Sequence, residues 1–522
     1  MSPPAPAASI ELAETLRIGI AAATTLLLAG GLVASWRRRP ELLRRTRSGL
    51  LAGLALLTIL VWWFPYQKGF GVWFHYWDSF HYYIGGKYFP ELGYTRIYAC
   101  TVTADVEAGY GTRAGGATIR NLETNQLESA RPLIADPDRC KRHFSEARWR
   151  AFSNDVAWFR RGLPLDAWLK IRTDHGYNAP PAWGLLGSLL ANTAPASVGQ
   201  LRLLTSIDPL LLALMFGAVA WAFGWRAMCI ALIFWGTNQP TRWEWVGGSI
   251  LRYDWLAASV GGLCCLRRGH PATAGILLAH ATCLRIFPVM IPAAMALAAL
   301  TRMRRERSWL PARNHLRFAA SFAGTVALLV AASSWTAGGF QSWVAFAENS
   351  RLHVATASTN LVGARALLSY RHDERAGVTV DRSRWEPYAA WKASRAETFA
   401  RRLPVYLALG LASVVLVALA ASRNPDWVTA VLGVGLIPVL LELSSYYFAI
   451  LLAFAFLWTR HEAIGVGLLL FSIATWLFRC GELDCDVASA WISGLILLFV
   501  AFSTLLALRR PPPEEAGSRP RA

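Results

Sequence analysis

The sequence predicts an all-α polytopic membrane protein, in which a bundle of helices crosses the membrane many times. Of the 522 residues, 54% are hydrophobic and only 16% are charged, whereas about 25% of the residues in soluble domains are charged. The shortage of charge indicates a large surface that faces lipid. Arginines also cluster between apolar segments, as at 37–47 and 302–307, which is typical of the cytoplasmic loops of membrane proteins.

The net charge of +19 does not indicate nucleic-acid binding, because it is explained by the arginines at the ends of apolar segments. The arginines flank apolar segments instead of forming one continuous basic face. The first apolar stretch, 10–35, has its arginine cluster after it, which is the reverse of a cleavable signal peptide. We therefore expect a retained first span whose N-terminus lies outside.

Fourteen apolar segments follow one another along the chain. A full crossing takes about 20 apolar residues, and several of the segments are shorter. We therefore expect broken or re-entrant helices, whose freed backbone groups must be covered by protein or face a water-filled cavity. The segments are 10–35, 48–64, 180–193, 203–223, 227–237, 250–266, 272–283, 286–301, 316–336, 403–421, 427–441, 446–459, 463–479 and 487–508.

The arginines also orient these segments, because basic loops resist translocation. An external N-terminus and a cytoplasmic C-terminus require an odd number of crossings, so about 13 segments cross and either 180–193 or 227–237 does not. The expected organisation is an N-terminal membrane pair with a basic cytoplasmic loop (1–65), a large external loop (66–179), a membrane core with short broken helices (180–336), a second external loop (337–402), C-terminal membrane helices (403–508) and a cytoplasmic tail (509–522).

The densest group of chemically versatile residues is the stretch 75–89. Asp78 lies there among aromatic residues, and a carboxylate that is partly desolvated by aromatic rings is a stronger proton acceptor. Trp77, His81 and Tyr82 are candidates for contacts with a sugar, because aromatic faces are platforms for sugar rings. The alternative is an interfacial aromatic belt in which Asp78 caps a helix.

A second polar group precedes the tandem prolines 180–181, which suit the first turn of a helix that re-enters the membrane. Its candidate binding residues are Asp174, His175 and Asn178, and ordinary capping of that helix is the alternative. More candidates fall on the external side of the membrane in the expected topology. For Arg252 and Asp254 the alternative is a simple local ion pair. These further candidates are Arg252, Asp254, His353, Asn360 and Tyr446.

Arg285 lies between two short apolar segments that meet at 284–288. A charge at that depth is expensive unless it is paired, so a functional role is the default interpretation. We expect it to bind the phosphate of a lipid-linked substrate through charge-assisted hydrogen bonds. The alternative is that its side chain snorkels to the lipid headgroups.

The eight cysteines divide by position. We expect the pairs Cys100–Cys140 and Cys480–Cys485 to form disulfides, because both fall in segments assigned to an oxidising compartment. The four cysteines in apolar segments, 229, 264, 265 and 283, are expected to be inert. The spacing contains no zinc-site pattern.

This layout resembles the GT-C superfamily of membrane glycosyltransferases and is most similar to its bacterial mannosyltransferase branch, glycosyltransferase family 87, which uses polyprenyl-phosphate sugars. The resemblance rests on Asp78, the prolines at 180–181, the break at 284–288, and the stretches 348–360 and 442–448. It implies a GT-C-like helical bundle, an acidic catalytic base in the first external loop, which maps to Asp78, and a basic residue for the lipid phosphate, which we assign to Arg285.

The chain departs from that pattern in three ways. Its first external loop is long, an additional span precedes the usual first one, and no Asp-Asp, Glu-Asp or Asp-x-Asp pair accompanies Asp78. A divalent metal is compatible with the family but has no support in this sequence, and no other cofactor is indicated. The long loop also leaves the acceptor open.

The expected function is transfer of a sugar, mannose or similar, from a polyprenyl-phosphate donor to a glycan, lipid or protein acceptor at the periplasmic face of the cell inner membrane. Asp78 is the expected base, with His81 or His175 orienting it. An inverting single displacement is favoured, because a double displacement needs a second carboxylate about 5 Å away. The alternatives are a transporter or flippase of a lipid-linked or anionic substrate, which broken helices and a buried arginine would also serve, and a non-catalytic assembly or sensor role.

The expected topology predicts which positions a membrane-impermeant thiol reagent reaches in intact cells. A cysteine introduced by Asn125→Cys should be labelled, whereas one introduced by Arg305→Cys should be labelled only after the membrane is permeabilised. Labelling at position 305 in intact cells, without labelling at position 125, would contradict the arrangement.

Overall fold

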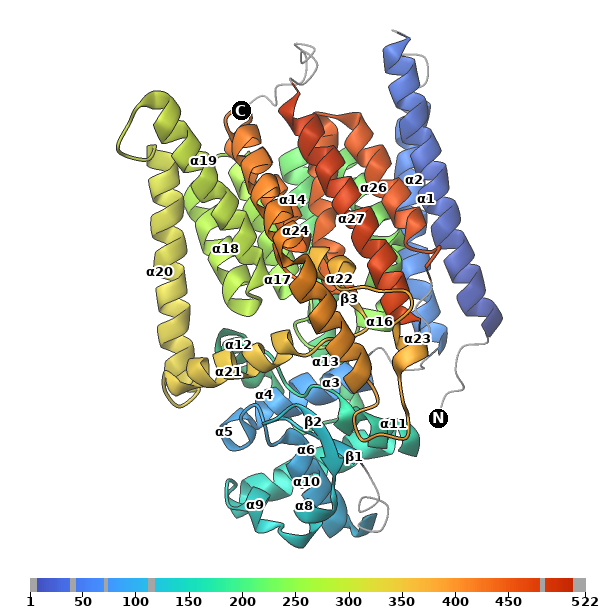
Figure 1. Cartoon of the computed structure of the whole chain (residues 1–522), viewed down its shortest axis with the longest axis vertical. Coiled ribbons are helices and arrows are strands. Elements are labelled where there is room, and N and C mark those ends of the chain that lie inside the picture. Colours follow the sequence, from blue (N-terminus) through green and yellow to red (C-terminus); the bar gives the residue numbers. More distant parts are fainter. Residues whose placement is uncertain (1–6, 38–43, 70–73, 111–117, 479–483, 510–522) are drawn as a thin grey trace.

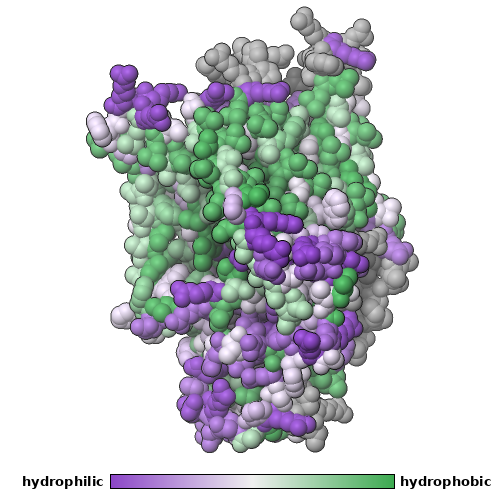
Figure 2. All heavy atoms as spheres, in the orientation of Figure 1, coloured by the Kyte–Doolittle hydropathy of each residue, from purple (hydrophilic) through white to green (hydrophobic). Residues whose placement is uncertain are grey.

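The computed structural model describes residues 7–37, 44–69, 74–110, 118–478 and 484–509. It is 77% helical with almost no sheet, which confirms the predicted helical class. Figure 1 shows a bundle of roughly parallel helices above a smaller region of short helices. In Figure 2 the bundle carries a broad hydrophobic band, and hydrophilic residues gather at its upper end and over the lower region.

Six helical stretches are long and apolar enough to cross a membrane, which supports the predicted membrane class. They are Glu11–Ala34, Arg45–Trp63, Val198–Phe223, Arg313–Thr336, Ala389–Ala421 and Cys485–Leu508. In the stretch Arg313–Thr336 only 11% of the most apolar window is buried, and in Ala389–Ala421 only 17%, so these two present extensive apolar surface. Shorter apolar helices make up the rest of the bundle, as the short sequence segments predicted. The number of crossings, about 13, stays a prediction.

The N-terminal pair, α1 (Ala7–Trp36) and α2 (Arg44–Gly69), packs along one side of the bundle. Helix α1 contacts α26 (Glu462–Ala474), near the other end of the chain, and α2 contacts α15 (Trp225–Thr237). In Figure 1 the expected cytoplasmic segment 302–315 lies at the upper end of the bundle, and the described parts of the expected external segment, 74–110 and 118–179, lie at the lower end.

Residues 74–110 and 118–179, which we call the hydrophilic region, fold into short helices and one hairpin. Ser145 caps its longest helix by accepting a hydrogen bond from the Arg148 backbone N–H, and a disulfide joins Cys100 to Cys140, as predicted. The elements are α3 (Tyr76–Ser79), η1 (Phe80–Ile84), α4 (Gly85–Lys87), α5 (Phe89–Leu92), α6 (Ile97–Asp105), η2 (Val106–Tyr110), α8 (Arg131–Ala135), α9 (Asp138–Lys141), α10 (Glu146–Gly162), α11 (Leu165–Lys170) and η3 (Ile171–Thr173), with a hairpin of β1 (Thr118–Asn121) and β2 (Gln126–Ser129).

The expected membrane core, 180–336, contains both of the local features predicted from the sequence, a helix start at the tandem prolines and a helix break. Pro181 is the first residue of α12, and the helix break expected at 284–288 separates α18 from α19, with Arg285 in extended backbone between them. Gly275 lets α18 and α20 approach closely, since a Cβ there would lie 2.5 Å from the Phe318 carbonyl oxygen. The elements are α12 (Pro181–Ala191), α13 (Val198–Thr205), α14 (Ile207–Phe223), α15, η4 (Gln239–Thr241), α16 (Trp243–Val246), α17 (Asp254–Arg267), α18 (Pro271–Leu284), η5 (Phe287–Val289), α19 (Met290–Glu306) and α20 (Arg313–Thr336).

The C-terminal part supplies the buried centre of the bundle, formed by α25 and η6. Helix α24 begins at Ala389 and not near 403 as predicted, because the polar but helix-favouring stretch before the apolar segment continues the same helix. Cys485 is disulfide-bonded, and its predicted partner Cys480 lies outside the described residues. The elements are α21 (Gln341–Ala355), β3 (Leu361–Val362), α22 (Ala364–Leu368), α23 (Ala376–Thr379), α24 (Ala389–Ala421), α25 (Asp426–Leu440), β4 (Leu443–Ser444), η6 (Ser445–Thr459), α26 and α27 (Cys485–Leu508), and β3 pairs antiparallel with β4.

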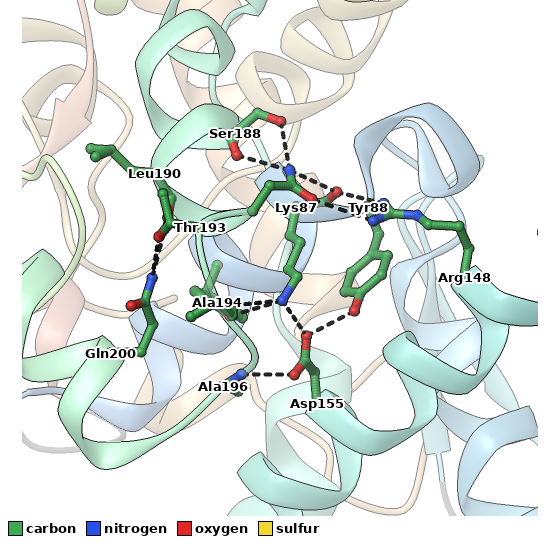
Figure 3. Close-up of polar contacts among 12 residues, drawn as sticks. Lys87, Tyr88, Arg148, Asp155, Ser188, Leu190, Thr193, Ala194, Ala196 and Gln200 are labelled. Atoms are coloured by element: carbon green, nitrogen blue, oxygen red, sulfur yellow. Dashed lines mark hydrogen bonds and ion pairs between the residues drawn. The ribbon is translucent and has the colours of Figure 1, made fainter.

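A buried ion pair fastens the hydrophilic region to the bundle (Figure 3). The Lys87 ammonium lies 2.9 Å from a carboxylate oxygen of Asp155 and donates to the Ala194 carbonyl oxygen at 2.8 Å. The Tyr88 hydroxyl and the Ala196 backbone N–H also donate to Asp155, both at 2.8 Å. Ala194 and Ala196 belong to the connection between α12 and α13. The pair therefore joins two helices of the hydrophilic region, α4 and α10, to the first helices of the membrane core.

Breaking this pair should destabilise the protein strongly, because the remaining charge would be buried without its partner. The side chains of Lys87 and Asp155 are only 8% and 3% exposed. We expect Asp155→Asn to lower the free energy of unfolding, measured by denaturant titration in micelles, by about 3–5 kcal/mol. The control is Arg150→Met, which removes an ion pair with Glu146 whose side chains are 69% and 86% exposed; it should change stability by less than about 1 kcal/mol. Equal effects of the two variants would contradict a structural role for the buried pair.

Candidate functional site

Asp78 lies on α3, where the hydrophilic region meets the membrane core. A carboxylate oxygen of Asp78 is 3.5 Å from a terminal nitrogen of Arg252, and the two side chains are 21% and 9% exposed. His75 fixes the backbone of Asp78, because its imidazole accepts a hydrogen bond from the Asp78 backbone N–H at 3.3 Å. The His75 backbone N–H in turn donates to the Gly248 carbonyl at 2.8 Å. Gly248 has a φ of 71°, which favours glycine. Asp78 thus presents a partly open carboxylate beside a buried guanidinium.

Arg252 is positioned by Asp208, a residue that sequence reasoning missed. The fully buried Asp208 carboxylate accepts the Arg252 backbone N–H at 2.9 Å and the Tyr253 N–H at 3.2 Å. The Arg252 guanidinium then lies over the Tyr446 ring, 4.7 Å from its centroid. The Arg252 side chain therefore reaches Asp78, whereas the alternative weighed from the sequence was a local ion pair with Asp254. A signal for Asp208 was present, since it is an acidic residue at the second position of an otherwise apolar helix.

Arg285 is buried at the break between α18 and η5, with 7% of its surface exposed. One terminal nitrogen donates to the Tyr82 hydroxyl at 3.1 Å and the other to the Leu284 carbonyl at 2.8 Å. Its Nε has no hydrogen-bond partner among the described residues. The negative charge of Asp254 acts on it. This enclosed position argues against snorkelling, since the guanidinium is held inside the protein.

Tyr82 connects the parts of this site. Its hydroxyl accepts from Arg285 and donates to the Asn178 side-chain oxygen at 3.3 Å, and its ring packs on Trp183 of α12 with centroids 5.2 Å apart. It also lies 5.9 Å from the Arg252 guanidinium. Tyr82 belongs to η1, a π-helical turn directly after α3, and such turns occur frequently at functional sites.

A second group of predicted residues surrounds Asp174. The Trp77 indole N–H donates to one carboxylate oxygen of Asp174 at 2.6 Å, and the His175 backbone N–H donates to the other at 2.8 Å. The His175 ring lies 5.6 Å from the His353 ring. Its Nδ1 is 3.0 Å from the side-chain oxygen of Asn125. Burial lowers the pKa of His175 to about 4, and the Arg120 charge contributes to the same shift.

His81 bonds to Trp77 and Tyr98 and does not orient Asp78 through a hydrogen bond, contrary to the expectation. Its Nδ1 is 3.0 Å from the Trp77 carbonyl oxygen and its Nε2 is 2.8 Å from the Tyr98 hydroxyl. Burial lowers its pKa, although the charges of Asp174 and Asp78 both act to raise it. The imidazole that contacts Asp78 is the one on residue 75.

The structure therefore gathers most of the predicted residues into two neighbouring groups. The first holds Asp78, Tyr82, Asn178, Arg252, Arg285 and Tyr446, and the second holds Trp77, Asp174, His175 and His353. Asp254 is linked to the first group through the effect of its charge on Arg285. Asn360 belongs to neither, because its carbonyl accepts the Ser445 N–H at 3.1 Å and its side-chain oxygen accepts the Ser358 hydroxyl at 2.9 Å. It positions the start of η6, which carries Tyr446.

Among the described residues, no three His, Cys, Asp or Glu side chains gather as the ligands of a metal ion.

The chain matches no known family model, no curated protein and no solved structure. The resemblance stated from the sequence therefore rests on the residues of the chain themselves.

The lowered pKa of His175 predicts a specific dependence of stability on pH. The unfolded chain takes up this proton near pH 6.5 and the folded protein only near pH 4. The contribution of His175 to the free energy of unfolding is therefore fully present above pH 6.5 and is lost as the pH falls to 4, by at most ~1.4 kcal/mol per pH unit. His175→Gln should flatten the stability curve in this range, as measured by denaturant titrations at several pH values. His372→Gln, at an exposed position, is the control, and an equal flattening in both variants would contradict the assignment.

Proposed function

We propose that this chain is a membrane glycosyltransferase that transfers a sugar, mannose or similar, from a polyprenyl-phosphate donor to a glycan, lipid or protein acceptor at the outer face of the cell inner membrane. The observation that carries the proposal is the convergence of one partly open carboxylate, Asp78, with two buried guanidiniums, Arg252 and Arg285, around Tyr82. Sugar transfer from a lipid phosphate needs these groups, a base for the acceptor and positive charge for the leaving phosphate.

Arg285 is the residue for the donor phosphate. It is buried at a helix break and retains one N–H group without a partner among the described residues. A phosphodiester gains a second negative charge when it departs as a phosphate monoester. Arg285 and Arg252 would stabilise that additional charge in a site from which water is largely excluded. The polyprenyl tail would lie between membrane helices.

The aromatic side chains around the arginines suit a sugar ring. The rings of Tyr446 and Tyr447 lie 4.6 Å apart, and Trp255 and Phe287 continue the wall. Aromatic faces contact the C–H surfaces of a sugar while their hydroxyl and N–H groups remain available for hydrogen bonds. We assign these rings to the sugar of the donor.

In the reaction, the acceptor hydroxyl oxygen forms a bond to the anomeric carbon while the bond from that carbon to the phosphate oxygen breaks. Asp78 takes the hydroxyl proton, and the polyprenyl phosphate leaves with the bonding electron pair. A single displacement of this kind inverts the anomeric configuration. Arg252 would hold the Asp78 carboxylate in place.

A transporter or flippase for a lipid-linked or anionic substrate is the second candidate. The observation that favours it is a buried arginine at a helix break, which is an arrangement that transporters use for anions. A transport function explains the Asp78 carboxylate less well, because that carboxylate would repel an anionic substrate.

Two variants separate chemistry from donor binding. Asp78→Asn keeps the side-chain shape and should lower turnover about 10²–10⁴-fold, since it removes the base, while leaving the binding of a labelled polyprenyl-phosphate sugar unchanged. Arg285→Ala should weaken donor binding by about 2–5 kcal/mol, because the phosphate loses a buried charged partner. Both are measured on protein in lipid nanodiscs with a panel of polyprenyl-phosphate hexoses and pentoses.

The matched control is Asp166→Asn, at an exposed position on α11, which should leave both quantities unchanged. Near-normal turnover of Asp78→Asn would exclude Asp78 as the base. Efficient transfer from a soluble nucleotide sugar, with no response to the lipid donors, would exclude the whole proposal.

A further inference from the structure

A cavity of about 360 Å³ is lined by Trp77, Asp174 and His175, and neither of the buried arginines, Arg252 and Arg285, lines it. Its walls come from three parts of the chain: the β1–β2 hairpin, the rest of the hydrophilic region, and the second hydrophilic segment (337–402). Ligand pockets for small molecules have volumes of about 300–1,000 Å³. The cavity therefore has room for a saccharide unit.

Hydrogen bonds between the walls give the cavity a defined shape. The Arg120 guanidinium donates to the carbonyls of Thr173 and Asn125, at 2.9 and 2.7 Å. The Asn125 side chain donates to the Thr356 hydroxyl, and the Leu127 backbone N–H donates to Glu386 at 2.6 Å. The hairpin is thus bonded to both other walls.

The cavity carries an excess of positive charge. Arg120, Lys170 and Lys392 line it, and Asp174 is the one acidic residue among its lining residues. Glu386 balances part of this charge, since it lies 3.4 Å from Lys392 and 4.0 Å from Arg120. Lys170 is exposed and makes no ion pair with a described residue. Both oxygens of Asp174 already accept hydrogen bonds from Trp77 and His175, so an anionic group of a ligand would meet the lysines and the arginine.

The uncharged groups of the cavity suit a sugar. The rings of Trp77 and Tyr388 are half-buried and line it, together with the hydroxyl-bearing residues Thr356 and Ser358. The Asn125 side-chain nitrogen donates to Thr356, so its oxygen accepts the Nδ1–H of His175. That leaves the lone pair of Nε2 on His175 to accept a hydrogen bond from a sugar hydroxyl.

The cavity borders the proposed catalytic group. Trp77 is part of its wall and is the residue next to Asp78. Charges on both Asp78 and Asp174 act on His81. The buried arginines contact Asp78 and Tyr82 and do not line the cavity. A ligand in the cavity therefore lies beside the residue that precedes Asp78, in a space separate from the two arginines proposed for the donor.

We propose that this cavity binds the acceptor and that the acceptor is an anionic saccharide, one that carries a carboxylate or a phosphate group. Its role as acceptor site rests on the proposed function, whereas the binding of an anionic saccharide does not. Trp77 and Tyr388 contact the sugar ring, His175 accepts from a hydroxyl, and Lys170 and Lys392 bind the anionic group.

The test is direct binding to the full-length protein in nanodiscs, without any donor, so that the result does not depend on turnover. The probes are trigalacturonate and glucose 6-phosphate, their neutral counterparts maltotriose and glucose, and inorganic phosphate. We expect at least one anionic saccharide to bind more tightly than its neutral counterpart and than phosphate. The double variant Lys170→Ala/Lys392→Ala should weaken that binding roughly tenfold, as expected for lost charge-assisted hydrogen bonds.

The variant Lys170→Arg/Lys392→Arg keeps the charge and should restore binding, which separates charge recognition from misfolding. Arg150→Ala, at an exposed arginine outside the cavity, should leave binding unchanged. Equal binding of charged and neutral saccharides, or binding of phosphate as tight as that of the saccharides, would overturn the proposal. The unmodified protein could also transfer no sugar and still bind an anionic saccharide through the two lysines. That result would exclude the proposed enzymatic function but not the binding site.

Discussion

The ion pair of Lys87 and Asp155 determines where the candidate site can form. Two charges that are removed from water are tolerated only when they are paired and fully hydrogen-bonded, and here Tyr88, Ala194 and Ala196 complete the set. The pair holds the end of the segment 75–87, whose start is held by the hydrogen bond from His75 to Gly248. Asp78 and Tyr82 lie between these two attachments, so the segment that carries them is fixed at both ends against the membrane core.

The same principle explains why the two buried arginines are informative. Arg252 is matched by Asp78 and by the ring of Tyr446, and Arg285 by Tyr82 and the more distant charge of Asp254. These contacts hold both guanidiniums at fixed positions inside the protein. Guanidiniums that are already in place can receive an anion with little reorganisation of the site.

Features that depend on local sequence could be predicted, and features that depend on distant partners could not. Hydropathy predicted the helical membrane class, and the prolines at 180–181 predicted a helix start that the structure confirms. The two short apolar segments that meet at 284–288 predicted a helix break, which is also present. Asp208 was missed because its partners, the backbone N–H groups of Arg252 and Tyr253, are more than forty positions away. The position of His81 was mispredicted for a similar reason, since the Tyr98 hydroxyl that engages His81 is supplied by α6.

The pairing of β3 with β4 means that the site can be completed only late in synthesis of the chain. Leu361 and Val362 find their partners only in Leu443 and Ser444, and the loop that bears Arg252 is completed by Tyr446 from the same late part of the chain. Asp78 is synthesised first, yet the rings and strand that enclose its surroundings leave the ribosome hundreds of codons later. The early helices must therefore persist as an unfinished assembly in the membrane, and a nascent chain released before residue 446 would insert without ever acquiring the site.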